Sequence, residues 1–448
     1  MRHIDGHQIL GALGQGGMSR VLKVRSAADG RIHALKLLAP HPNLEGLLGM
    51  TELQRRFRFE AEVLQQVDHP HVVRLIAAQL SGAQWYVLLE YHCRTVSEWI
   101  GEGSEGEEAT RPIRPDLALT VARQTALALQ ALHDRGLVHR DVKPANLLLD
   151  ASRVVKLADF GLSKLRGEWE IQPPQMVVGS PFYAPPEQER QPESVDQRAD
   201  WYSLGVVLFR LISGRLPGKK PAWRLVTREF GPAGEEVLSR ILAVNPANRP
   251  GQAIEVLAGL ERMERYWLGH REASCRLRWQ ELLQSRRQTP GKARLRSRPR
   301  KVGLSQARQI FPVTALWQTN RHRATILVAD GDIIRDRQTD LIWQQAGSPT
   351  RLEWTAAQAY IDRLNRDIWA GQRNWRLPTA DELLSLLQPD APLDDFCLQP
   401  LFDRRQHRLW SADRRSFIAA WIVDVESGYL GWQDFTCPAF VRAVSSGS

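Results

Sequence analysis

The run HRDVKPAN, followed thirteen residues later by DFG, constrains this chain of 448 residues more than any other feature. Asp141, Asn146 and Asp159 supply side-chain oxygens within these motifs, and Lys143 supplies a cation two positions after Asp141. Phosphoryl transfer from ATP requires a carboxylate beside the accepting hydroxyl, oxygen ligands for Mg²⁺ and cations along the triphosphate. The spacing therefore predicts a phosphoryl-transfer site with a catalytic base and two metal ligands, and Asp141, Asn146, Asp159, Lys143 and Lys36 can supply its parts.

A glycine-rich hairpin is predicted near the start of the chain. The sequence LGQGGMSRV lies between two apolar strands, and its glycines let backbone N–H groups approach phosphate oxygens. Many glycine-rich hairpins bind no ligand, so the position of this hairpin relative to the other motifs has to decide whether it binds phosphate. The following apolar strand, IHALKLL, carries a single charge at Lys36, where the cation that pairs with the α- and β-phosphates is expected.

The next predicted element is a helix that supplies a partner for this lysine. Phe57, Ala61 and Leu64 recur at helical spacing in ELQRRFRFEAEVLQQV, and Glu60 adjoins their apolar face. Glu62 lies about 200° around the helix from Glu60, so only one of the two can face the strand. We expect Glu60 to pair with Lys36; the alternative is a solvated helix whose acidic residues are all exposed.

Together these segments resemble the bacterial Hanks-type serine/threonine protein kinases from about residue 9 to about residue 267. The matching segments are LGQGGMSRV, HALK, LLEYH, HRDVKPANLLL, LADFGLS, GSPFYAPPEQ, ADWYSLGVVLFRLISG and NPANRP. The resemblance implies an α+β, two-lobed kinase domain over residues 1–270, with an N-lobe to about residue 91 and a C-lobe from about residue 92. It also implies an enzyme that uses ATP and Mg²⁺ to phosphorylate serine or threonine in protein substrates.

The resemblance also implies roles for individual residues. Asp141 would accept the proton of the substrate hydroxyl, and Lys143 would steady the γ-phosphate. Ser180 would position the substrate, while Glu187 and Arg249 would form a buried structural ion pair. Asp200 would brace the catalytic loop, and Leu89 would be the gatekeeper. The implied ATP-binding residues are Leu13, Gly14, Gln15, Gly16, Gly17, Met18, Ser19, Arg20, Val21, Ala34, Lys36, Leu89, Glu90, His92 and Leu148.

The segment between the DFG and PPE motifs is poor in phosphate acceptors. Its serine and threonine residues are Ser163 and Ser180 alone, although Arg140 is of the type that often pairs with a phosphate. We hypothesise that Glu168 or Glu170 takes the place of that phosphate opposite Arg140.

Three other functional classes compete with an active protein kinase. A pseudokinase typically lacks one of Lys36, Asp141 or Asp159, and all three are present. A small-molecule kinase of the aminoglycoside type would lack the GSPFYAPPE segment, which in protein kinases shapes a surface for an extended peptide. The remaining alternative is an interaction scaffold in which the nucleotide site is a switch and the C-terminal module carries the function.

Residues 271–310 form a basic segment rich in Arg, Ser, Gln, Pro and Gly, which predicts a flexible linker. Eleven Lys or Arg and no Asp or Glu lie between residues 282 and 329, so this region accounts for the whole net charge of +10. Its charge could attract nucleic acid, anionic lipid or an acidic protein. A solvated spacer is the interpretation we favour, because no aromatic residue is interleaved between Arg286 and Lys301.

Tryptophan becomes dense after Phe311, which predicts a second compact core over residues 311–448. The segments TDLIWQ, WTAAQAYIDRLN, NWRLPTADELLSLL, LWSAD, AAWIVDVESGYLGW and FVRAV resemble the Lcl C-terminal domain family, which is related to C-type-lectin-like folds. The resemblance implies an α+β domain with two helices, of which Thr379 caps the second. Most of the tryptophans are expected to be core residues. Ligand sensing, substrate recruitment and oligomerisation are all open roles, and the ligand is unknown.

Several other classes of site and location are not supported by the sequence. A QPD tripeptide begins at Gln388, but no nearby run completes the six or more oxygens that Ca²⁺ prefers. The four cysteines form no CxxC pair, which suggests neither a zinc ribbon nor a disulfide framework. We expect no transmembrane segment and a cytoplasmic location.

Overall fold

The structure is a computed structural model of the chain that describes residues 3–103, 108–150, 152–160, 164–165, 182–191, 194–285, 294–321, 326–388, 398 and 401–446. It contains two compact units, Met1–Gly269 and His270–Ser448. Among the described residues, no helix is long and apolar enough to cross a membrane.

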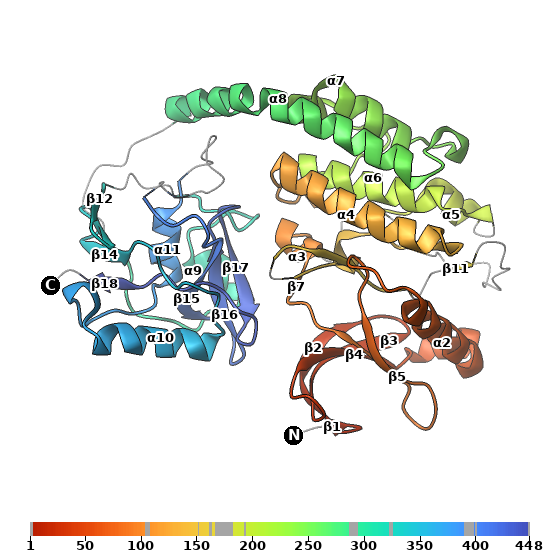
Figure 1. Ribbon diagram of the computed structural model, residues 1–448, viewed down its shortest axis with the longest axis horizontal. Coiled ribbons are helices and arrows are strands. Elements are labelled where there is room, and N and C mark those ends of the chain that lie inside the picture. The colour runs from red at the N-terminus through yellow and green to blue at the C-terminus, as the bar shows by residue number, and fades with distance from the viewer. Residues whose placement is uncertain are drawn as a thin grey trace. The chain divides into compact units, whose positions relative to one another are not determined.

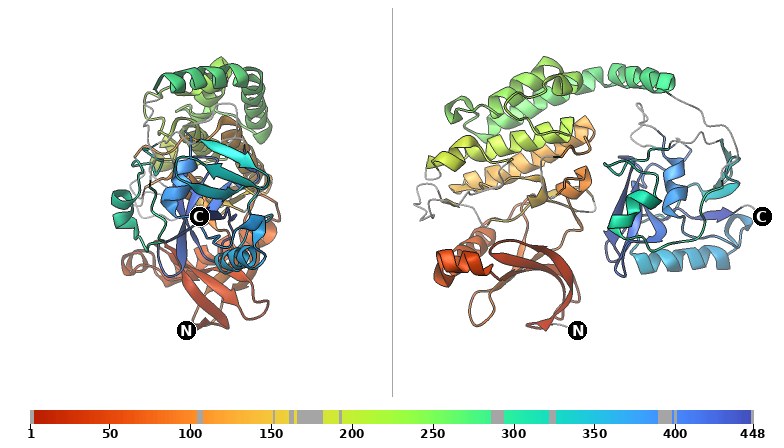
Figure 2. Two further views of the ribbon diagram at one scale, coloured as in Figure 1. Left: turned by 90° about the vertical axis from the view of Figure 1, so that its left-hand side faces the viewer. Right: turned by 180° about the vertical axis from the view of Figure 1, so that it is seen from behind.

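The first unit begins with an antiparallel sheet of six strands in the order β1-β2-β3-β4-β6-β5. Figure 2 shows that this sheet, drawn in red and orange, is strongly curved. Two helices follow β4 in the chain, and the second of them buries Leu53, Phe57, Ala61 and Leu64. The elements are β1 (His3–Ile4), β2 (His7–Gln15), β3 (Ser19–Ser26), β4 (Ile32–Leu38), α1 (Pro42–Leu48), α2 (Met50–Gln66), β5 (Leu75–Gln79) and β6 (Tyr86–Glu90).

The rest of the first unit is mainly helical, with α4, α6, α7 and α8 stacked in successive layers (Figure 1). Helix α6 is buried along almost its whole length, as its nearly continuous apolar sequence requires. Short strands precede α3 and lie between α4 and α5. The helices are α3 (Val96–Ile100), α4 (Pro115–His133), α5 (Pro186–Arg190), α6 (Arg198–Ser213), α7 (Arg224–Ile241) and α8 (Ala253–Ser285). The strands are β7 (Arg94–Thr95), β8 (Leu137–Val138), β9 (Leu147–Leu149), β10 (Val155–Leu157) and β11 (Lys164–Leu165).

Helix α7 contains a kink that packing against α8 explains. Gly231 has φ +58° inside the helix and is followed by Pro232. A Cβ atom at Gly231 would lie 2.1 Å from the ring of Tyr266 on α8. Only glycine therefore allows both the left-handed backbone and this close approach.

The second unit contains two antiparallel sheets and three helices among its described residues. One sheet has the order β12-β13-β14-β18 and the other has the order β15-β16-β17. The elements are α9 (Leu304–Ile310), β12 (Leu327–Asp330), β13 (Ile333–Asp336), β14 (Leu341–Gln344), α10 (Trp354–Arg366), α11 (Ala380–Leu386), β15 (Arg408–Arg414), β16 (Ala419–Asp424), β17 (Tyr429–Asp434) and β18 (Val444–Ser446). The two helices expected from WTAAQAYIDRLN and TADELLSLL are confirmed as α10 and α11.

Tryptophan side chains form much of this second core, as the sequence predicts. Trp343, Trp410 and Trp421 are fully buried, and Trp354 and Trp375 are nearly so. Thr379 caps α11 in a capping box with Glu382, which satisfies backbone N–H groups at the start of the helix. The expected cap at Thr379 is therefore confirmed.

The structure differs from the expected linker over residues 271–310 at both ends of that segment. Helix α8 continues to Ser285, beyond the predicted end of the kinase domain. Val302 and Ala307 are fully buried in the second core, and the Val302 carbonyl accepts a hydrogen bond of 2.9 Å from Trp421 Nε1. The composition did not predict this burial, because a few apolar residues scattered among arginines are also typical of a solvated linker. The surface that buries them is not visible in the local sequence.

Candidate active site

Lys36 projects from β4 between two carboxylates that come from distant parts of the chain. Its Nζ lies 2.5 Å from Glu60 Oε1 on α2 and 2.8 Å from Asp159 Oδ1. Burial would lower the pKa of Lys36, but the charges of Asp159 and Glu60 outweigh burial and raise it. The lysine is therefore held as a cation in a fixed position.

Helix α2 presents Glu60 to Lys36 and turns Glu62 to solvent. Glu60 is 1% exposed and shares the buried face with Phe57 and Leu64, whereas Glu62 is exposed. The pairing expected from helical spacing is therefore present. Burial raises the pKa of the Glu60 carboxyl, and the charge of Lys36 opposes that rise.

The catalytic loop brings Asp141, Lys143 and Asn146 together after β8. Lys143 Nζ lies 2.7 Å from Asp141 Oδ2, and Asn146 Nδ2 donates to the same oxygen at 3.0 Å and to the Asp141 backbone carbonyl at 2.8 Å. Lys143 is a quarter exposed, while Asp141 is buried. The carboxylate is thus fixed from one side by two donors of the same loop.

Asp200 on α6 supports this loop by hydrogen bonds to its backbone. Its side chain is fully buried and accepts hydrogen bonds from the backbone N–H groups of Arg140 at 2.7 Å and His139 at 2.9 Å. Arg140 has φ +68°, an uncommon value for a residue with a side chain. The two bonds to Asp200 hold the backbone in that conformation, so the brace implied for Asp200 is present.

Asp159 lies two residues after the end of β10. Its backbone has φ +68°, and its side chain is about half exposed. The charge of Lys36 is the main reason that the pKa of this carboxyl is lowered to about 2. The neighbouring Phe160 is buried and packs edge-on against His139 with a ring separation of 5.1 Å. Asp159 is therefore ionised and anchored to the catalytic loop through its neighbour.

Of the residues expected around the adenine ring, Val21, Ala34 and Leu89 lie on strands of the first sheet, while Leu148 lies on β9. Ala34 on β4 is opposite Leu89 on β6, and Val21 on β3 is opposite Lys36. Val21, Ala34 and Leu148 are partly exposed apolar residues, while Leu89 is 8% exposed. They provide apolar surface of the kind that a flat ring can cover.

The segment after β6 is fixed by the side chain of Glu90. Although burial would raise its pKa, hydrogen bonds from His92, the Arg74 backbone and Lys156 lower the pKa of Glu90 to about 2. Lys156 Nζ lies 3.0 Å from Glu90 Oε1. The carboxylate therefore holds the residues between Glu90 and His92, whose backbone groups are expected to face adenine.

The glycine-rich hairpin joins β2 to β3 and contains Leu13 to Val21. Gly16 N donates to the Ser19 carbonyl at 2.8 Å, which closes the turn. The carbonyls of Gly17 and Met18 accept hydrogen bonds from His41 N at 2.8 Å and Ala39 N at 3.1 Å. The hairpin is thus tied to the segment that precedes α1, a connection that the sequence did not predict.

The expected ion pair of Glu187 and Arg249 is present and joins the start of α5 to the segment after α7. Arg249 Nη2 donates to Glu187 Oε2 at 2.8 Å, and Nη1 donates to Oε1. The Arg249 side chain has no solvent exposure and also donates to the Ala243 carbonyl at 2.7 Å. Gln188 next to Glu187 donates to the Arg140 carbonyl at 2.8 Å, so this anchor reaches the catalytic loop.

Two contacts around the site were missed by sequence reasoning. His133 Nε2 lies 2.7 Å from Asp200 Oδ2, and Tyr183 donates to Glu102 at 2.6 Å. Arg210 on α6, which is fully buried, lies 3.5 Å from the same Glu102 carboxylate. No local pattern signals either contact, because the partners lie 67 and 81 residues apart in sequence.

Some expectations fall on residues outside those that the structure describes. These are the substrate-positioning role of Ser180, the acceptor Ser163, the proposed partners Glu168 and Glu170 of Arg140, the last residue of DFG, the end of the QPD tripeptide and Cys397.

The oxygen atoms available near Asp141 suit a small divalent cation. Asn146 uses its Nδ2 atom as a donor, which leaves its amide oxygen for a cation, and Asp159 contributes a half-exposed carboxylate. Among the described residues, no group of three or more His, Cys, Asp or Glu side chains could hold a metal alone. Mg²⁺ is usually bound by one or two protein oxygens together with phosphates, so the residues present fit it.

Comparison with known proteins identifies both units. Residues 7–257 match the protein kinase domain family, and residues 332–445 match the Lcl C-terminal domain family. The chain belongs to the protein kinase family. Its fold is that of a protein kinase domain followed by a further α+β region, as the sequence predicts. Members of this family use ATP, typically with a divalent metal ion.

Several bacterial serine/threonine protein kinases are similar to the first unit. Pkn2 of Myxococcus xanthus is 35% identical over 245 residues, which are 53% of this chain and 28% of that protein. PrkC of Bacillus subtilis is 33% identical over 212 residues, 47% of this chain and 31% of that protein. PknB of Mycobacterium leprae is 31% identical over 283 residues, 58% of this chain and 43% of that protein. The chain thus spans less than half the length of each.

Proposed function

We propose that this protein is a serine/threonine protein kinase that transfers the γ-phosphate of Mg-ATP to protein substrates. The observation that carries the proposal is the constellation around Asp141, in which Lys143 and Asn146 hold one side of the carboxylate. Lys36, held as a cation by Glu60 and Asp159, completes the set of charges that the reaction needs.

In this proposal Asp141 orients the substrate hydroxyl and accepts its proton as the new bond to phosphorus forms. Lys143 and Asn146 both bind Asp141 Oδ2 and so fix the carboxylate that would meet the substrate hydroxyl. Lys143 is partly exposed beside it and would stabilise negative charge on the transferred phosphate. Lys36 would bind the α- and β-phosphates.

Asn146 and Asp159 would hold Mg²⁺, which would neutralise charge on the phosphates when bound. Lys36 also binds Asp159 Oδ1, so the lysine would fix the metal-binding carboxylate as well as the nucleotide. Since ATP is the phosphate donor, the proposal includes a cytoplasmic location for this unit. The C-terminal unit would serve in sensing or in substrate recruitment.

The proposal is tested by transfer of labelled phosphate from Mg-ATP to a generic basic protein and to the chain itself. We expect Asp141→Asn to lower the rate by at least about a thousandfold, because the base is lost while the nucleotide site remains. Asp134→Asn is the matched control, since Asp134 is an exposed carboxylate at the end of α4. Its rate should equal that of the unmodified chain.

Phosphoserine or phosphothreonine that forms only when Asp141 is present would support the proposal. If the unmodified chain binds ATP but transfers no phosphate to either acceptor, the proposal fails, and a nucleotide-binding scaffold becomes the better interpretation. Equal transfer by the unmodified chain and Asp141→Asn would also contradict it.

A further inference from the structure

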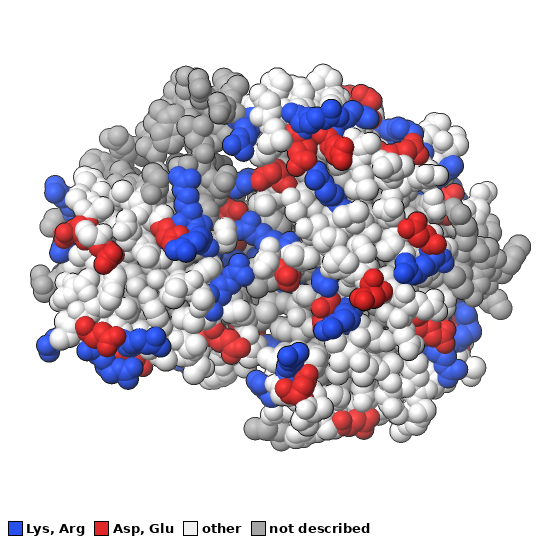
Figure 3. Space-filling model, in the orientation of Figure 1, with Lys and Arg blue, Asp and Glu red and all other residues white. Residues whose placement is uncertain are grey.

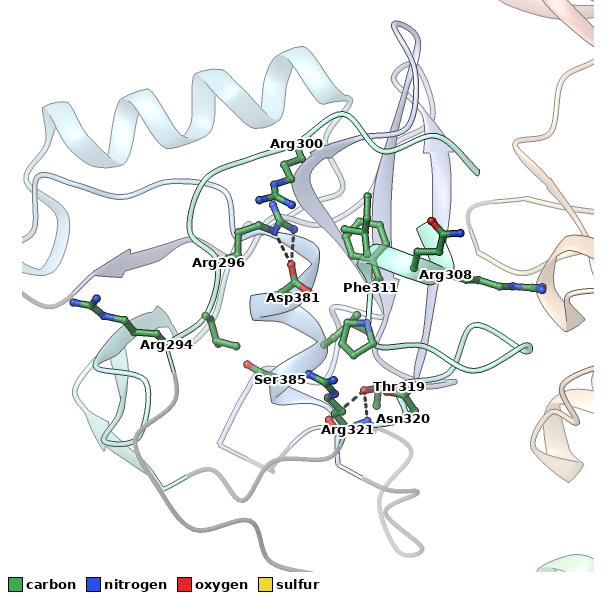
Figure 4. Close-up of a pocket in the computed structure, with 15 residues that line it drawn as sticks. Arg294, Arg296, Arg300, Arg308, Phe311, Thr319, Asn320, Arg321, Asp381 and Ser385 are labelled. Carbon is green, nitrogen blue, oxygen red and sulfur yellow. Dashed lines mark hydrogen bonds and ion pairs between the residues drawn. The ribbon is translucent and has the colours of Figure 1, made fainter. Parts of the chain in front are cut away.

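A basic pocket lies within the second unit, and part of its lining comes from residues 271–310, which the sequence suggested were a linker. Its volume is about 400 Å³, which is within the usual range of about 300–1,000 Å³ for small-ligand sites. Figure 4 shows the residues that line it. Twelve of the fifteen come from residues 294–321, and the other three come from α11. The matched Lcl family region begins only at residue 332, so most of this pocket is an addition to that domain.

The charge of the pocket is strongly positive. Arg294, Arg296, Arg300, Arg308 and Arg321 line it, and the one acidic residue among those lining it is Asp381. Asp381 is paired with Arg296, whose Nη2 atom lies 2.5 Å from Asp381 Oδ2. Four arginines therefore remain without a lining carboxylate to neutralise them.

Arg296 has a structural function that sets it apart from the other four. Its Nη1 and Nη2 atoms each donate at 2.7 Å to the carboxylate of Asp413, which has no solvent exposure. It also binds Asp381, and its backbone carbonyl accepts a hydrogen bond of 2.7 Å from Thr379 Oγ1. Arg296 thus fastens the basic segment to α11 and β15 and forms a rigid floor for the pocket.

Arg300 and Arg321 are the two arginines best placed to meet a ligand. Both are exposed, and they lie at opposite ends of the residues drawn in Figure 4, with Asp381 and Ser385 between them. Their backbones are fixed, because Arg300 N donates to Asp413 Oδ1 at 2.7 Å and Arg321 N donates to Thr319 Oγ1 at 3.3 Å. Fixed backbones with exposed guanidinium groups favour a binding role over a structural one.

The remaining lining residues suit a small molecule. Leu295 is partly exposed and supplies apolar surface, Phe311 and Leu384 are buried core residues, and Asn320 is an exposed amide. On the face shown in Figure 3, acidic and basic residues are interspersed among the described residues, with no long stripe of one sign. Nucleic acid is bound by extended positive surfaces, whereas these arginines gather around one pocket of about 400 Å³, which favours a compact anion.

We propose that this pocket binds a small ligand that carries two or more phosphate groups, with Arg300 and Arg321 as its main cationic contacts. Arginine suits this class because its planar donors bind phosphate oxygens in pairs. A ligand with phosphates at separate positions would meet a cation at each end of the pocket, and its apolar part would contact Leu295. The site is separate from the proposed nucleotide site, which lies in the first unit.

The test is isothermal titration calorimetry of the full chain with inorganic tripolyphosphate, in a buffer with EDTA to exclude metal ions. The pocket variant is Arg300→Gln with Arg321→Gln. The matched control is Arg366→Gln with Arg373→Gln, which removes the same charge from exposed residues of the same unit that do not line the pocket. Thermal unfolding of each variant checks that the fold is kept.

We expect the pocket variant to bind tripolyphosphate at least tenfold more weakly than the unmodified chain and the control to bind it equally well. The affinity of the unmodified chain should also fall as NaCl is added. Equal binding by the pocket variant and the control would overturn the proposal, because the charge alone would then explain the affinity. No binding by the folded, unmodified chain would overturn it too.

Two macromolecular ligands are tested in the same way, with a phosphoserine peptide and with a single-stranded RNA oligonucleotide. If either binds through Arg300 and Arg321 while tripolyphosphate does not, the small-molecule proposal is wrong and a docking site for that macromolecule replaces it. Tripolyphosphate bound by the nucleotide site of the first unit would appear as a second binding event that both variants retain, and the number of bound ligands per chain distinguishes it from binding in the pocket.

Discussion

His139 shows how one buried side chain sets the geometry of the proposed base. Its Nδ1 atom accepts a hydrogen bond of 3.2 Å from the Asp141 backbone N–H, and its Nε2 atom lies 3.3 Å from the Ala158 carbonyl. This pattern requires a neutral ring with its hydrogen on Nε2. Burial lowers the pKa of His139, against the opposing charges of Asp200, Asp141 and Asp159. The ring therefore joins the catalytic loop to the segment that carries Asp159.

The stability of the first unit should consequently fall as the pH drops below about 6.5, the usual pKa of histidine. Below that pH the unfolded chain binds a proton at His139 that the folded chain excludes, so acid favours unfolding by up to about 1.4 kcal/mol per pH unit. His139→Asn should reduce this pH dependence, because asparagine does not titrate and its amide oxygen can accept from the Asp141 N–H. Urea denaturation between about pH 5 and pH 7 measures the effect.

The control for this change is His3→Asn, since His3 is exposed in β1. Its dependence on pH should match that of the unmodified chain. His69 and His71 also have pKa values lowered mainly by burial, so part of the acid sensitivity should persist in every variant. Identical profiles for His139→Asn and the unmodified chain would show that the ring does not resist protonation.

At the scale of elements, the helical part of the first unit holds its loops through buried charge. Helix α6 supplies Asp200 to the catalytic loop, and Arg249 after the turn that follows α7 supplies a charge to Glu187 at the start of α5. The Arg249 guanidinium also lies 4.7 Å from the ring centre of Tyr202 on α6. One arginine thus joins three segments that are far apart in sequence.

Arg249→Ala should destabilise the first unit by about 3 kcal/mol or more, because it leaves the Glu187 carboxylate without its buried partner. The matched control is Arg240→Ala, which removes an arginine that pairs with Glu255 at the surface, where Arg240 is 53% exposed. We expect that change to cost less than about 1 kcal/mol. Chemical denaturation of the two variants measures the difference, and equal costs would contradict the structural role of Arg249.

At the scale of the whole molecule, the chain divides into two compact units, and its basic region belongs largely to the second. Residues 294–310 are fastened there by buried Val302 and Ala307 and by the ion pairs of Arg296. Burial would lower the pKa of Arg296, but its bonds to Asp413 and Asp381 raise it, so it stays charged. The positive charge of Arg296 is therefore held at a fixed position on a folded domain.

Arg296→Ala should lower the stability of the second unit by about 3 kcal/mol and leave that of the first unit unchanged, because Asp413 is buried and would lose its partner. Arg298→Ala is the control, since its exposed side chain is two residues away in the same segment. Unfolding followed by tryptophan fluorescence and by ATP binding distinguishes the units. A flexible linker would give equal stabilities for both variants.

The sequence by itself determined the kinase family, the identity of its charged motifs and the apolar faces of its helices. The residues of the HRD and DFG motifs lie close together in the sequence. Helical periodicity alone predicted that Glu60, and not Glu62, faces Lys36. Periodicity and a capping signal also located α10, α11 and the cap at Thr379. These features depend on residues near one another in the chain, so local patterns suffice to predict them.

Only the tertiary structure decided which distant residues meet and which surfaces become buried. The ties from Gly17 and Met18 to the segment before α1 and the pair of Tyr183 and Glu102 join parts of the chain that share no pattern. The basic region was the largest difference. Its few apolar residues gave no sign of a core because the partners that bury them, Trp421 and α11, lie about a hundred residues later. Because those later residues bury the segment, part of the predicted linker lines a pocket of the second unit.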